Sequence, residues 1–253
     1  MNANTSPLPS REGPGEGDQS TQPEMLKAEN VGKTFILHLQ QGLRLPVLEK
    51  ITLTVHQGEC IALTGPSGAG KSTFIRALHA NYRVDAGKIL VRHHGHFVDI
   101  AAADPRTILA VRRDTIGYVS QFLRTIPRVP TIDIVAEAAT IRGAPQDEAR
   151  ESAKKLLLRL NIPARLHALP PATFSGGEQQ RVNLARGFIA GHPILLLDEP
   201  TASLDHENAA IVVDMIAQAK SAGVAIVGIF HDREVREAVA TASLIVSPLQ
   251  DAA

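Results

Sequence analysis

The sequence has no tryptophan, few other aromatic residues and a single cysteine, Cys60. One cysteine excludes a disulfide framework within the chain and fits a reducing compartment. Cys60 stands in the apolar run Glu-Cys-Ile-Ala-Leu with no basic pair beside it. Because a reactive thiol needs an activating positive charge nearby, we predict that this cysteine is buried and structural.

Long apolar runs and an excess of one charge are also missing. No run approaches the roughly 18 residues that a membrane span needs, and the N-terminus has no hydrophobic signal core. We therefore expect a cytoplasmic protein with no direct membrane insertion. The chain has 26 Lys and Arg against 26 Asp and Glu, and this balance argues against a nucleic-acid partner.

The sequence does contain enough apolar residues for a full core. With 253 residues, 44% of them hydrophobic, the chain fits one large α/β domain or a domain with an inserted subdomain. Residues 1–24 consist mainly of Pro, Gly, Ser, Thr and Gln. Such a segment cannot bury enough surface to offset its ordering entropy, so we predict a disordered tail. The folded domain is predicted to span 25–248.

Short strands and helices alternate along this domain. The predicted strands are Leu26–Asn30, Thr34–Leu39, Ile51–Val55, Glu59–Leu63, Lys88–Arg92, Phe97–Ile100, Ile116–Val119, Ile194–Leu197 and Val224–Phe230. The predicted helices are Thr73–Ala80, Ile132–Arg142, Gln146–Leu160 and Glu207–Ala219, and a short helix and strand are predicted within Glu234–Ser247. The helix-rich stretch of about 131–170 separates two groups of motifs, so we predict that it is an inserted helical subdomain.

A phosphate-binding loop follows the strand Glu59–Leu63. It matches G-x-x-x-x-G-K-[ST] in full and leads through Thr73 into a helix; its residues are Gly65, Pro66, Ser67, Gly68, Ala69, Gly70, Lys71 and Ser72. The glycines let backbone N–H groups turn inward around phosphate oxygens, and the helix N-terminus adds its partial positive charge. We expect Lys71 to reach the β- and γ-phosphates and Ser72 to ligate Mg²⁺. The loop therefore predicts a nucleoside triphosphate site.

Two carboxylates follow a second buried strand. Asp198 and Glu199 come directly after the apolar run Ile194–Leu197, and His231 directly follows the last buried strand. Because the C-terminal ends of parallel strands share one sheet edge, we expect these groups to converge on the phosphate loop. Asp198 is predicted to hold Mg²⁺ together with Ser72. Glu199 is predicted to orient or deprotonate an attacking water, and His231 to donate to the γ-phosphate.

A helix start at Ser175 indicates a second anion site. Ser175 and Glu178 form an S-x-x-E capping box. Gly176 and Gly177 between them are poor helix formers and leave N–H groups exposed at the positive end of the helix dipole. A nucleotide on the same chain could hardly reach this site across the helical insertion. A head-to-tail dimer, in which each Ser175 closes on the nucleotide of the other chain, resolves the geometry, so we predict a dimer.

Together these motifs resemble those of the ATP-binding-cassette (ABC) ATPases. GPSGAGKS, Gln121, FSGGEQQR, ILLLDE, Ser203-Leu204-Asp205 and His231 occur in the order of the family's Walker A, Q-loop, signature, Walker B, D-loop and switch histidine. The signature differs from the commonest LSGGQ at Phe174 and Glu178 but keeps the serine and the glycines. We expect closure on the nucleotide to survive these differences.

The resemblance carries expectations about fold, ligands and residues. It implies an α/β fold, the P-loop NTPase ABC nucleotide-binding domain, with an antiparallel β subdomain and an inserted α-helical subdomain. It implies ATP and Mg²⁺ as ligands and Phe35 as the aromatic residue that stacks on adenine. Gln121 would contact the metal and serve catalysis, and Asp205 would lie at the nucleotide.

A closer resemblance covers about Met25 to Ser247. The segments VGKTFILH, RLPVL, HANY, SQFLRTIPR, FSGGEQQRVNLARGFI and GIFHD are similar to those of ABC subunits of the bacterial carbon–phosphorus lyase system, which breaks down phosphonates. This resemblance implies a head-to-tail ABC dimer in a soluble complex whose other subunits include a second ABC subunit. ATP hydrolysis would support formation of ribose 1-methylphosphonate 5-triphosphate from ATP and an alkylphosphonate, with the glycosyl transfer on another subunit.

Other classes of protein share the ATP site. The nucleotide-binding subunit of a membrane transporter, such as an importer or a lipoprotein exporter, would dock its membrane-spanning partner near Gln121 and the helical insertion. A P-loop small-molecule kinase would need neither the SGGE helix nor a D-loop. DNA-repair ABC proteins typically carry long coiled-coil or zinc insertions, and the sequence has no heptad run or cysteine cluster. The sequence favours the phosphonate-system ATPase, with the transporter subunit as the alternative.

Overall fold

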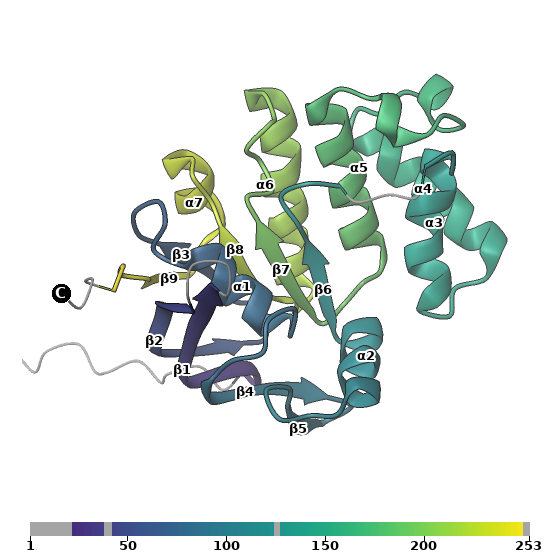
Figure 1. Ribbon diagram of the computed structural model, residues 1–253. Helices are drawn as coiled ribbons and strands as arrows, with labels where there is room; N and C mark the ends of the chain where they lie inside the picture. The colour runs from purple at the N-terminus through teal and green to yellow at the C-terminus, as the bar shows by residue number, and fades with distance from the viewer. Residues whose placement is uncertain (1–21, 38–41, 124–126, 250–253) are drawn as a thin grey trace, which may run out of the picture.

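The computed structural model describes residues 22–37, 42–123 and 127–249, which form two β-sheets with helices around them (Figure 1). The described strands form a four-stranded antiparallel sheet in the order β2-β1-β4-β5 and a five-stranded parallel sheet in the order β6-β7-β8-β3-β9. The strands are β1 (Glu24–Leu37), β2 (Leu43–His56), β3 (Cys60–Thr64), β4 (Ala86–His93), β5 (His96–Asp99), β6 (Ile116–Val119), β7 (Ile194–Asp198), β8 (Ala225–Ile229) and β9 (Ala242–Ile245). The α-helices are α1 (Lys71–Leu78), α2 (Pro105–Asp114), α3 (Thr131–Ile141), α4 (Gln146–Arg159), α5 (Gly176–Ile189), α6 (His206–Ser221) and α7 (Arg233–Val239), and Ala164–Leu166 and Pro171–Thr173 are short 3₁₀ helices.

Two long paired strands, β1 and β2, form half of the antiparallel sheet. β1 and β2 each run for 14 residues and pair along most of that length. The prediction of two separate strands, Leu26–Asn30 and Thr34–Leu39, is therefore wrong. A single strand continues through Asn30, whose φ is 50°, and register shifts on both sides of Val31 maintain the pairing. Residues 38 and 39, and residues 1–21 of the predicted tail, lie outside the described residues, and the last tail residue, Glu24, begins β1.

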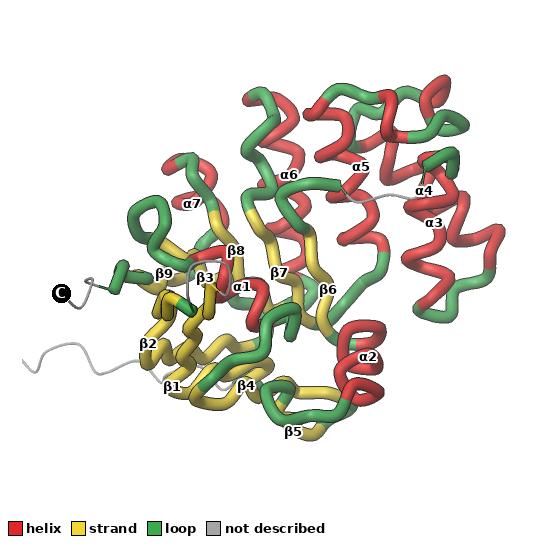
Figure 2. Tube along the Cα trace, in the orientation of Figure 1, coloured by secondary structure: helices red, strands yellow, loops and turns green. Residues whose placement is uncertain are grey.

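The parallel sheet is covered on both faces. Every residue of β7 and β8 is buried. Ile194 and Leu196 pack in one core cluster with α1 and the antiparallel sheet, while Leu195 and Leu197 pack in a second cluster with α5 and α6. Figure 2 shows these layers around the parallel strands. Burial on both faces explains why the strand reads as a continuous apolar run in the sequence.

The helical insertion lies beyond the edge of the parallel sheet that β6 forms. α3 and α4 pack against each other and against α5 (Figure 1). Ala153 and Leu157 are fully buried at helical spacing on α4, as the apolar stripe predicts. The predicted helices Ile132–Arg142 and Gln146–Leu160 agree with α3 and α4 to within one residue at each end. Within the described residues, no helix combines the length and the apolar character that crossing a membrane requires.

Helix α2 is present although the sequence analysis predicts no helix there. Val111 is its one buried residue, so the segment lacks the apolar periodicity of a helix packed on a core. The sequence feature that could have predicted this helix lies at its N-terminus. Asp104 accepts hydrogen bonds from the N–H groups of Arg106 and Thr107, and Pro105 occupies the first turn, where a missing N–H costs nothing.

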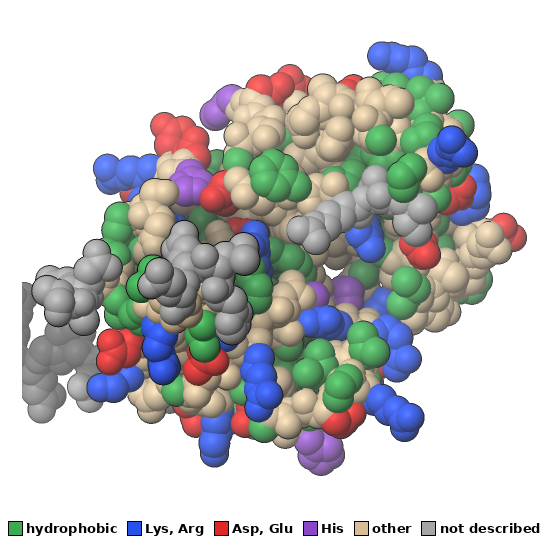
Figure 3. All heavy atoms as spheres, in the orientation of Figure 1, with side chains coloured by type: hydrophobic (Ala, Val, Ile, Leu, Met, Phe, Trp, Pro, Cys, Tyr) green, Lys and Arg blue, Asp and Glu red, His purple; other side chains and the backbone are tan. Residues whose placement is uncertain are grey.

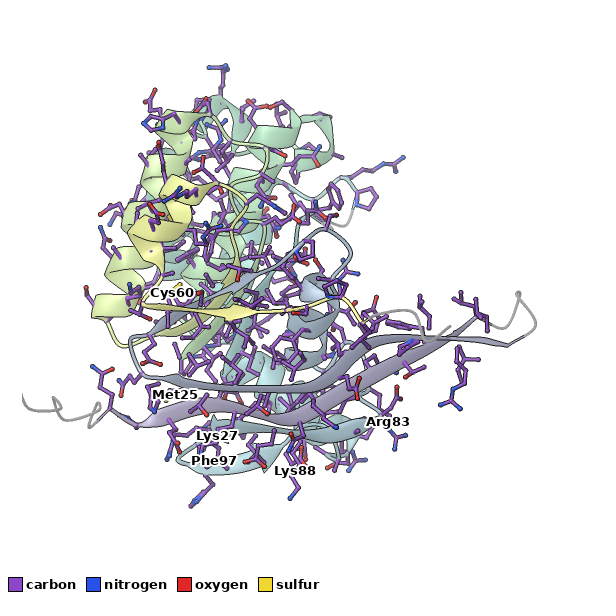
Figure 4. The ribbon with its side chains drawn as sticks, turned by 90° about the vertical axis from the view of Figure 1, so that its left-hand side faces the viewer. Met25, Lys27, Cys60, Arg83, Lys88 and Phe97 are labelled. Atoms are coloured by element: carbon purple, nitrogen blue, oxygen red, sulfur yellow. The ribbon has the colours of Figure 1, made fainter. Side chains whose placement is uncertain are left out.

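The lone cysteine is buried, as predicted. Cys60 has no exposed surface, and its N–H donates to Oγ1 of Thr241 just before β9, beside which Figure 4 shows it. Burial raises the pKa of the Cys60 thiol to about 12. The thiol therefore stays protonated at neutral pH and serves as a small apolar side chain.

Gly187 allows helix α5 to approach strand β6 closely. A Cβ atom at this position would lie 2.2 Å from Cγ2 of Val119, which is fully buried and restricted in its rotamers by β-branching. We expect Gly187→Ala to destabilise the protein by about 1–3 kcal/mol. Thermal unfolding followed by circular dichroism should show a lower midpoint. Gly176→Ala is the matched control, since apart from its chain neighbours and its own helix backbone no described atom lies within 4 Å of a Cβ there. Equal midpoints for the two variants would contradict the steric argument.

Candidate functional site

Four strands of the parallel sheet deliver the predicted site residues to one edge. The phosphate loop follows β3, and Asp198 is the last residue of β7. Gln121 and His231 each lie two residues beyond the ends of β6 and β8. The register pairs Val119 of β6 with Leu197 of β7. Residues far apart in the sequence therefore meet at the carboxyl edge of the sheet, where α/β proteins bind ligands.

Three glycines give the phosphate loop a backbone that other residues rarely adopt. Gly65, Gly68 and Gly70 have φ angles of 133°, 79° and 94°. A Cβ atom on Gly65 would lie 2.1 Å from the carbonyl oxygen of Val246, and one on Gly70 would lie 2.9 Å from the carbonyl oxygen of Val47. The loop is exposed from Gly65 to Gly68. Its shape therefore depends on glycine and leaves the backbone open to an anion.

Lys71 opens helix α1 and folds back over the loop. Its Nζ donates to the carbonyl oxygens of Gly65 and Pro66, both at 2.8 Å. Gly70 is the N-cap of α1, and no side chain in the described part of the chain caps this helix start. The first N–H groups of α1 and the ammonium group of Lys71 are donors that suit phosphate oxygens.

Asp198 is buried among polar partners. Only 1% of its surface is exposed. Oγ of Ser72 donates to Oδ1 at 3.1 Å, the Tyr118 hydroxyl donates to Oδ2 at 3.0 Å, and Nε of Arg76 lies 4.0 Å from Oδ2. Burial, and then the charge of Asp198, raise the pKa of Tyr118 to about 12, so its hydroxyl remains a donor. Adjacent ligands of an octahedral ion held at ~2.1 Å are about 3 Å apart, so the oxygens of Ser72 and Asp198 fit Mg²⁺ as they stand.

Glu199 is held by groups from two other strand ends. Nε2 of Gln121 donates to Oε2 at 2.9 Å, and Nε2 of His231 lies 2.7 Å from Oε1. We call Glu199, Gln121 and His231 the carboxylate clasp. The φ of Glu199 is 56°, an uncommon value for a residue with a side chain. This backbone strain directly after a buried strand is typical of functional sites.

Two buried polar residues of α5 hold the backbone behind the clasp. Nε2 of Gln180 donates to the carbonyl oxygens of Glu199 and Pro200 at 3.5 and 3.2 Å. Nδ2 of Asn183 donates to the carbonyl oxygen of Ser120 at 2.5 Å. Both side chains are more than nine-tenths buried. The sequence analysis does not single them out, although two amides three residues apart on a buried helix face are a usable signal.

Ser175 caps α5 in the predicted way. Its Oγ accepts from the Glu178 N–H at 3.3 Å, and Oε2 of Glu178 accepts from the Ser175 N–H at 2.9 Å, so the capping box is confirmed. The hydrogen bonds from Ser175 lower the pKa of the Glu178 carboxyl. Ser175 and Gly176 are exposed, and a Cβ atom on Gly177 would lie 2.9 Å from the carbonyl oxygen of Ser203. The start of α5 is therefore open to a second molecule.

Asp205 caps α6 and is tied to α5. Its Oδ1 accepts from the N–H and from Nδ2 of Asn208, at 2.9 and 2.8 Å, and these bonds lower its pKa. Nη1 of Arg181 on α5 donates to Oδ1 of Asn208 at 2.8 Å. Among the hydrogen bonds of the described residues, none joins Asp205 to the phosphate loop. Through Asn208, the structure therefore links Asp205 to α5 and not to the clasp.

Phe35 lies on β1 and is half-buried. Its ring packs edge-on against Tyr82, with centroids 5.3 Å apart and planes at 84°, and Nζ of Lys33 lies 5.4 Å from its centroid. A ring that is packed on one side and partly exposed suits stacking on a base. Tyr82, which the sequence analysis does not assign to the site, supports this ring.

Comparison with known proteins decides the family. The sequence profile of the family described as ABC transporter matches residues 48–202. This chain belongs to the ABC transporter family. Among its relatives, the arginine transport ATP-binding protein ArtP of Haemophilus influenzae is 38% identical over 192 residues, which cover 76% of this chain and 78% of ArtP. The lipoprotein-releasing system ATP-binding protein LolD of Maricaulis maris is 36% identical over 184 residues, which cover 73% of this chain and 77% of LolD.

Solved ABC structures confirm the fold class. A dimeric post-hydrolysis state of the ATP-binding cassette MJ0796, bound to ADP and Pi, aligns with a TM-score of 0.79 and 26% identity over 89% of this chain and 97% of that chain. The predicted P-loop NTPase ABC fold, with its antiparallel sheet and helical insertion, is therefore confirmed. ABC ATPases bind ATP with Mg²⁺, and the glycine-shaped loop and the adjacent Ser72 and Asp198 oxygens fit these ligands. Because the aligned cassette is dimeric, it supports the predicted head-to-tail dimer.

Proposed function

We propose that this ABC chain hydrolyses ATP in a head-to-tail dimer and is the PhnL-type ATPase subunit of a carbon–phosphorus lyase complex. The carboxylate clasp is the observation that supports hydrolysis, because it holds a carboxylate between two donors beside the phosphate loop. The segments that resemble carbon–phosphorus lyase ABC subunits support the choice of complex.

In this proposal the phosphate loop, residues 65–73, binds the phosphates of ATP, and Phe35 stacks on adenine. When ATP binds, Nζ of Lys71 gives up its hydrogen bonds to the carbonyl oxygens of Gly65 and Pro66 and donates to phosphate oxygens instead. Ser72, Asp198 and Gln121 are the residues that would hold Mg²⁺, which when bound neutralises charge on the phosphate oxygens. The hydrogen bond between Ser72 and Asp198 supports this assignment, because it holds two of the candidate ligand oxygens side by side.

Glu199 orients the attacking water and accepts its proton, and His231 donates to the γ-phosphate. Each oxygen of Glu199 has one partner in the clasp and keeps a further lone pair, so a water can bind the carboxylate while Gln121 and His231 hold it in place. Ser175, Gly176 and Gly177 of the partner subunit complete the site by presenting N–H groups at the helix start. Asp205 of the partner subunit lies with them, because Asp205 is tied to α5.

Three of the six segments of the closer resemblance contribute residues to one cleft. His79, Asn81 and Tyr82 of the HANY segment and Ser120, Gln121 and Phe122 of the SQFLRTIPR segment line a single cleft beside the ATP site. Residues 124–126 of the latter segment lie outside the described residues. Since the motifs common to ABC ATPases surround the nucleotide, this cleft is where features of one particular complex would act.

The relatives ArtP and LolD favour a second candidate function. Their printed names are those of transport and lipoprotein-releasing ATP-binding proteins. In this candidate the chain is the nucleotide-binding subunit of a membrane transporter and docks a membrane-spanning partner near Gln121 and α3. The ATP chemistry is identical, so the partner and the cellular process distinguish the two candidates.

Growth on a phosphonate tests the proposal. A cell whose only copy of this gene carries Glu199→Gln is expected to grow normally on inorganic phosphate and to fail with methylphosphonate as the sole phosphorus source. Glu237→Gln makes the same chemical change on the exposed surface of α7 and should permit growth on both. Normal growth of the Glu199→Gln cell on methylphosphonate would overturn the phosphonate assignment.

Co-purification identifies the partner independently. The tagged chain, recovered from cells grown on methylphosphonate, should bring down other carbon–phosphorus lyase subunits that mass spectrometry identifies. Recovery with integral membrane subunits alone would decide for the transporter candidate. Glu199→Gln is useful here as well, since an ATP-bound dimer that cannot turn over should hold its partners for longer.

A further inference from the structure

The two oxygens of the Asp198 carboxylate face different groups. Oδ1 accepts a hydrogen bond from Oγ of Ser72 at 3.1 Å, whereas Oδ2 accepts one from the Tyr118 hydroxyl at 3.0 Å. Nε of Arg76 lies 4.0 Å from the same Oδ2. Because Ser72 is the other oxygen ligand of the proposed Mg²⁺ site, Oδ1 is on the side of the metal, and protein groups occupy the side of Oδ2.

The register of the parallel sheet brings Tyr118 to this carboxylate. Tyr118 on β6 pairs with Leu196 on β7, two residues before Asp198. Side chains two residues apart on a strand point to the same face of the sheet. Tyr118 and Asp198 therefore share the face on which Leu196 packs in one core cluster with α1. The long tyrosine side chain can reach along the diagonal between the two strands.

Helix α1 places a group beside each oxygen of Asp198. Ser72 and Arg76 are four residues apart on α1, so they lie on the same face of the helix. Nη1 of Arg76 also donates to the Tyr82 hydroxyl at 3.3 Å, which holds the guanidinium group in place. A divalent cation at Oδ2 would be repelled by this guanidinium group. The charge of Arg76 therefore favours metal binding through Oδ1.

The carboxylate of Asp198 depends on protein groups for its orientation. Only 1% of its surface is exposed. Arg76 and Tyr118 line the cleft beside the ATP site, and Asp198 does not. Figure 3 shows a hollow in this region with arginine or lysine and histidine side chains around it. A buried carboxylate needs hydrogen-bond donors from the protein, and the Tyr118 hydroxyl supplies the one at Oδ2.

The ring of Tyr118 has contacts that do not involve its hydroxyl. The ring is half-buried and packs against His79, with centroids 5.1 Å apart and planes at 32°. Phenylalanine at this position would keep that packing and would remove the donor to Asp198. The role of the hydroxyl can therefore be separated from the role of the ring.

We propose that Tyr118 is a positioning residue of the metal site, which holds Oδ2 of Asp198 so that the carboxylate binds Mg²⁺ through Oδ1 alone. Binding through one oxygen suits Mg²⁺, which demands near-octahedral geometry and usually keeps several waters. Ca²⁺ accepts one or both oxygens of a carboxylate, so a free Oδ2 would favour Ca²⁺. Tyr118 thus contributes to selectivity for Mg²⁺ as well as to affinity. The inference rests on the ATP and Mg²⁺ site of the proposed function and not on the phosphonate-system assignment.

The affinity for nucleotide with and without metal tests the proposal. Isothermal titration calorimetry gives the Kd of adenylyl imidodiphosphate, a non-hydrolysable ATP analogue, in EDTA, in Mg²⁺ and in Ca²⁺. We expect Tyr118→Phe to bind the metal-free analogue as the unchanged protein does. It should bind the Mg²⁺ complex about tenfold more weakly, since loss of a hydrogen bond to a metal ligand typically costs 10- to 100-fold in metal affinity. Its affinity for the Ca²⁺ complex should fall by less.

Tyr82→Phe is the matched control. Tyr82 is the only other tyrosine of the chain, and its hydroxyl accepts from Arg76. This variant should keep the ratio of the affinities with and without Mg²⁺.

The proposal fails if Tyr118→Phe binds the Mg²⁺ complex as the unchanged protein does. It also fails if the variant loses as much affinity in EDTA or in Ca²⁺ as in Mg²⁺, because general damage to the site would weaken all three. A different result identifies a failure of the proposed function. If Mg²⁺ has no effect on the Kd of the unchanged protein, the metal site itself is refuted, and this inference with it.

Discussion

Replacing Glu199 with glutamine is expected to lower the turnover number of ATP hydrolysis by roughly 10²- to 10⁴-fold, the usual contribution of a positioned general base. The amide has the shape of the carboxylate and can keep hydrogen bonds to Gln121 and His231, but it cannot accept a proton from water. ATP affinity should change little, because the phosphate loop and the oxygens of Ser72 and Asp198 are untouched. The variant should therefore accumulate as an ATP-bound dimer.

Phosphate release measures the turnover, and size-exclusion chromatography with Mg²⁺ and ATP measures the dimer. Glu237→Gln is the matched control, since it removes a carboxylate that pairs with Arg233 on the exposed surface of α7. That variant should keep the turnover of the unchanged protein. Turnover of Glu199→Gln within a few-fold of the unchanged protein would show that another group activates the water.

Removing the ammonium group of Lys71 should weaken ATP binding itself. Hydrogen bonds to charged groups contribute about 1.5–3 kcal/mol, so we expect Lys71→Ala to raise the Kd for ATP by roughly 10- to 100-fold. Without nucleotide the variant loses only two hydrogen bonds to the carbonyl oxygens of Gly65 and Pro66. Its fold should therefore persist while its affinity falls.

The rise of the thermal midpoint with added ATP reports the affinity, because a ligand that binds the folded state alone stabilises it by mass action. Lys71→Ala should show little rise at ATP concentrations that saturate the unchanged protein. Lys88→Ala removes an exposed ammonium from β4, on the antiparallel sheet (Figure 4), and should respond to ATP as the unchanged protein does. An unchanged affinity of Lys71→Ala would count against the role assigned to the phosphate loop.

The parts of the fold that pack on a core could be predicted from the sequence. The strand Ile116–Val119 and the helices α3 and α4 agree closely with the structure because buried apolar residues mark them. The convergence of Asp198, His231 and the phosphate loop follows from the geometry of parallel strands alone. The phosphate-loop motif predicts that Gly65 and Gly70 are needed for backbone freedom, and the structure adds that neighbouring carbonyl groups leave no room for a side chain.

The sequence does not show which partner each polar side chain contacts. Tyr118 on β6 donates to Asp198, which lies 80 residues further along the chain. Gln180 and Asn183 look like ordinary helix residues until their carbonyl acceptors are known. These features depend on contacts between distant residues, which periodicity and local motifs cannot report.

In the proposed head-to-tail dimer, helix α5 connects the nucleotide sites of the two chains. Its start at Ser175 is exposed, while the side chains of Gln180 and Asn183 further along donate hydrogen bonds to the backbone at Glu199 and Ser120. At Gly187 the same helix packs directly against β6, the strand that ends before Gln121. The helix and the strand are therefore in close contact. A helix moves as a unit, and a shift at its start is carried to both anchors. The two ATP sites of such a dimer cannot be geometrically independent of each other.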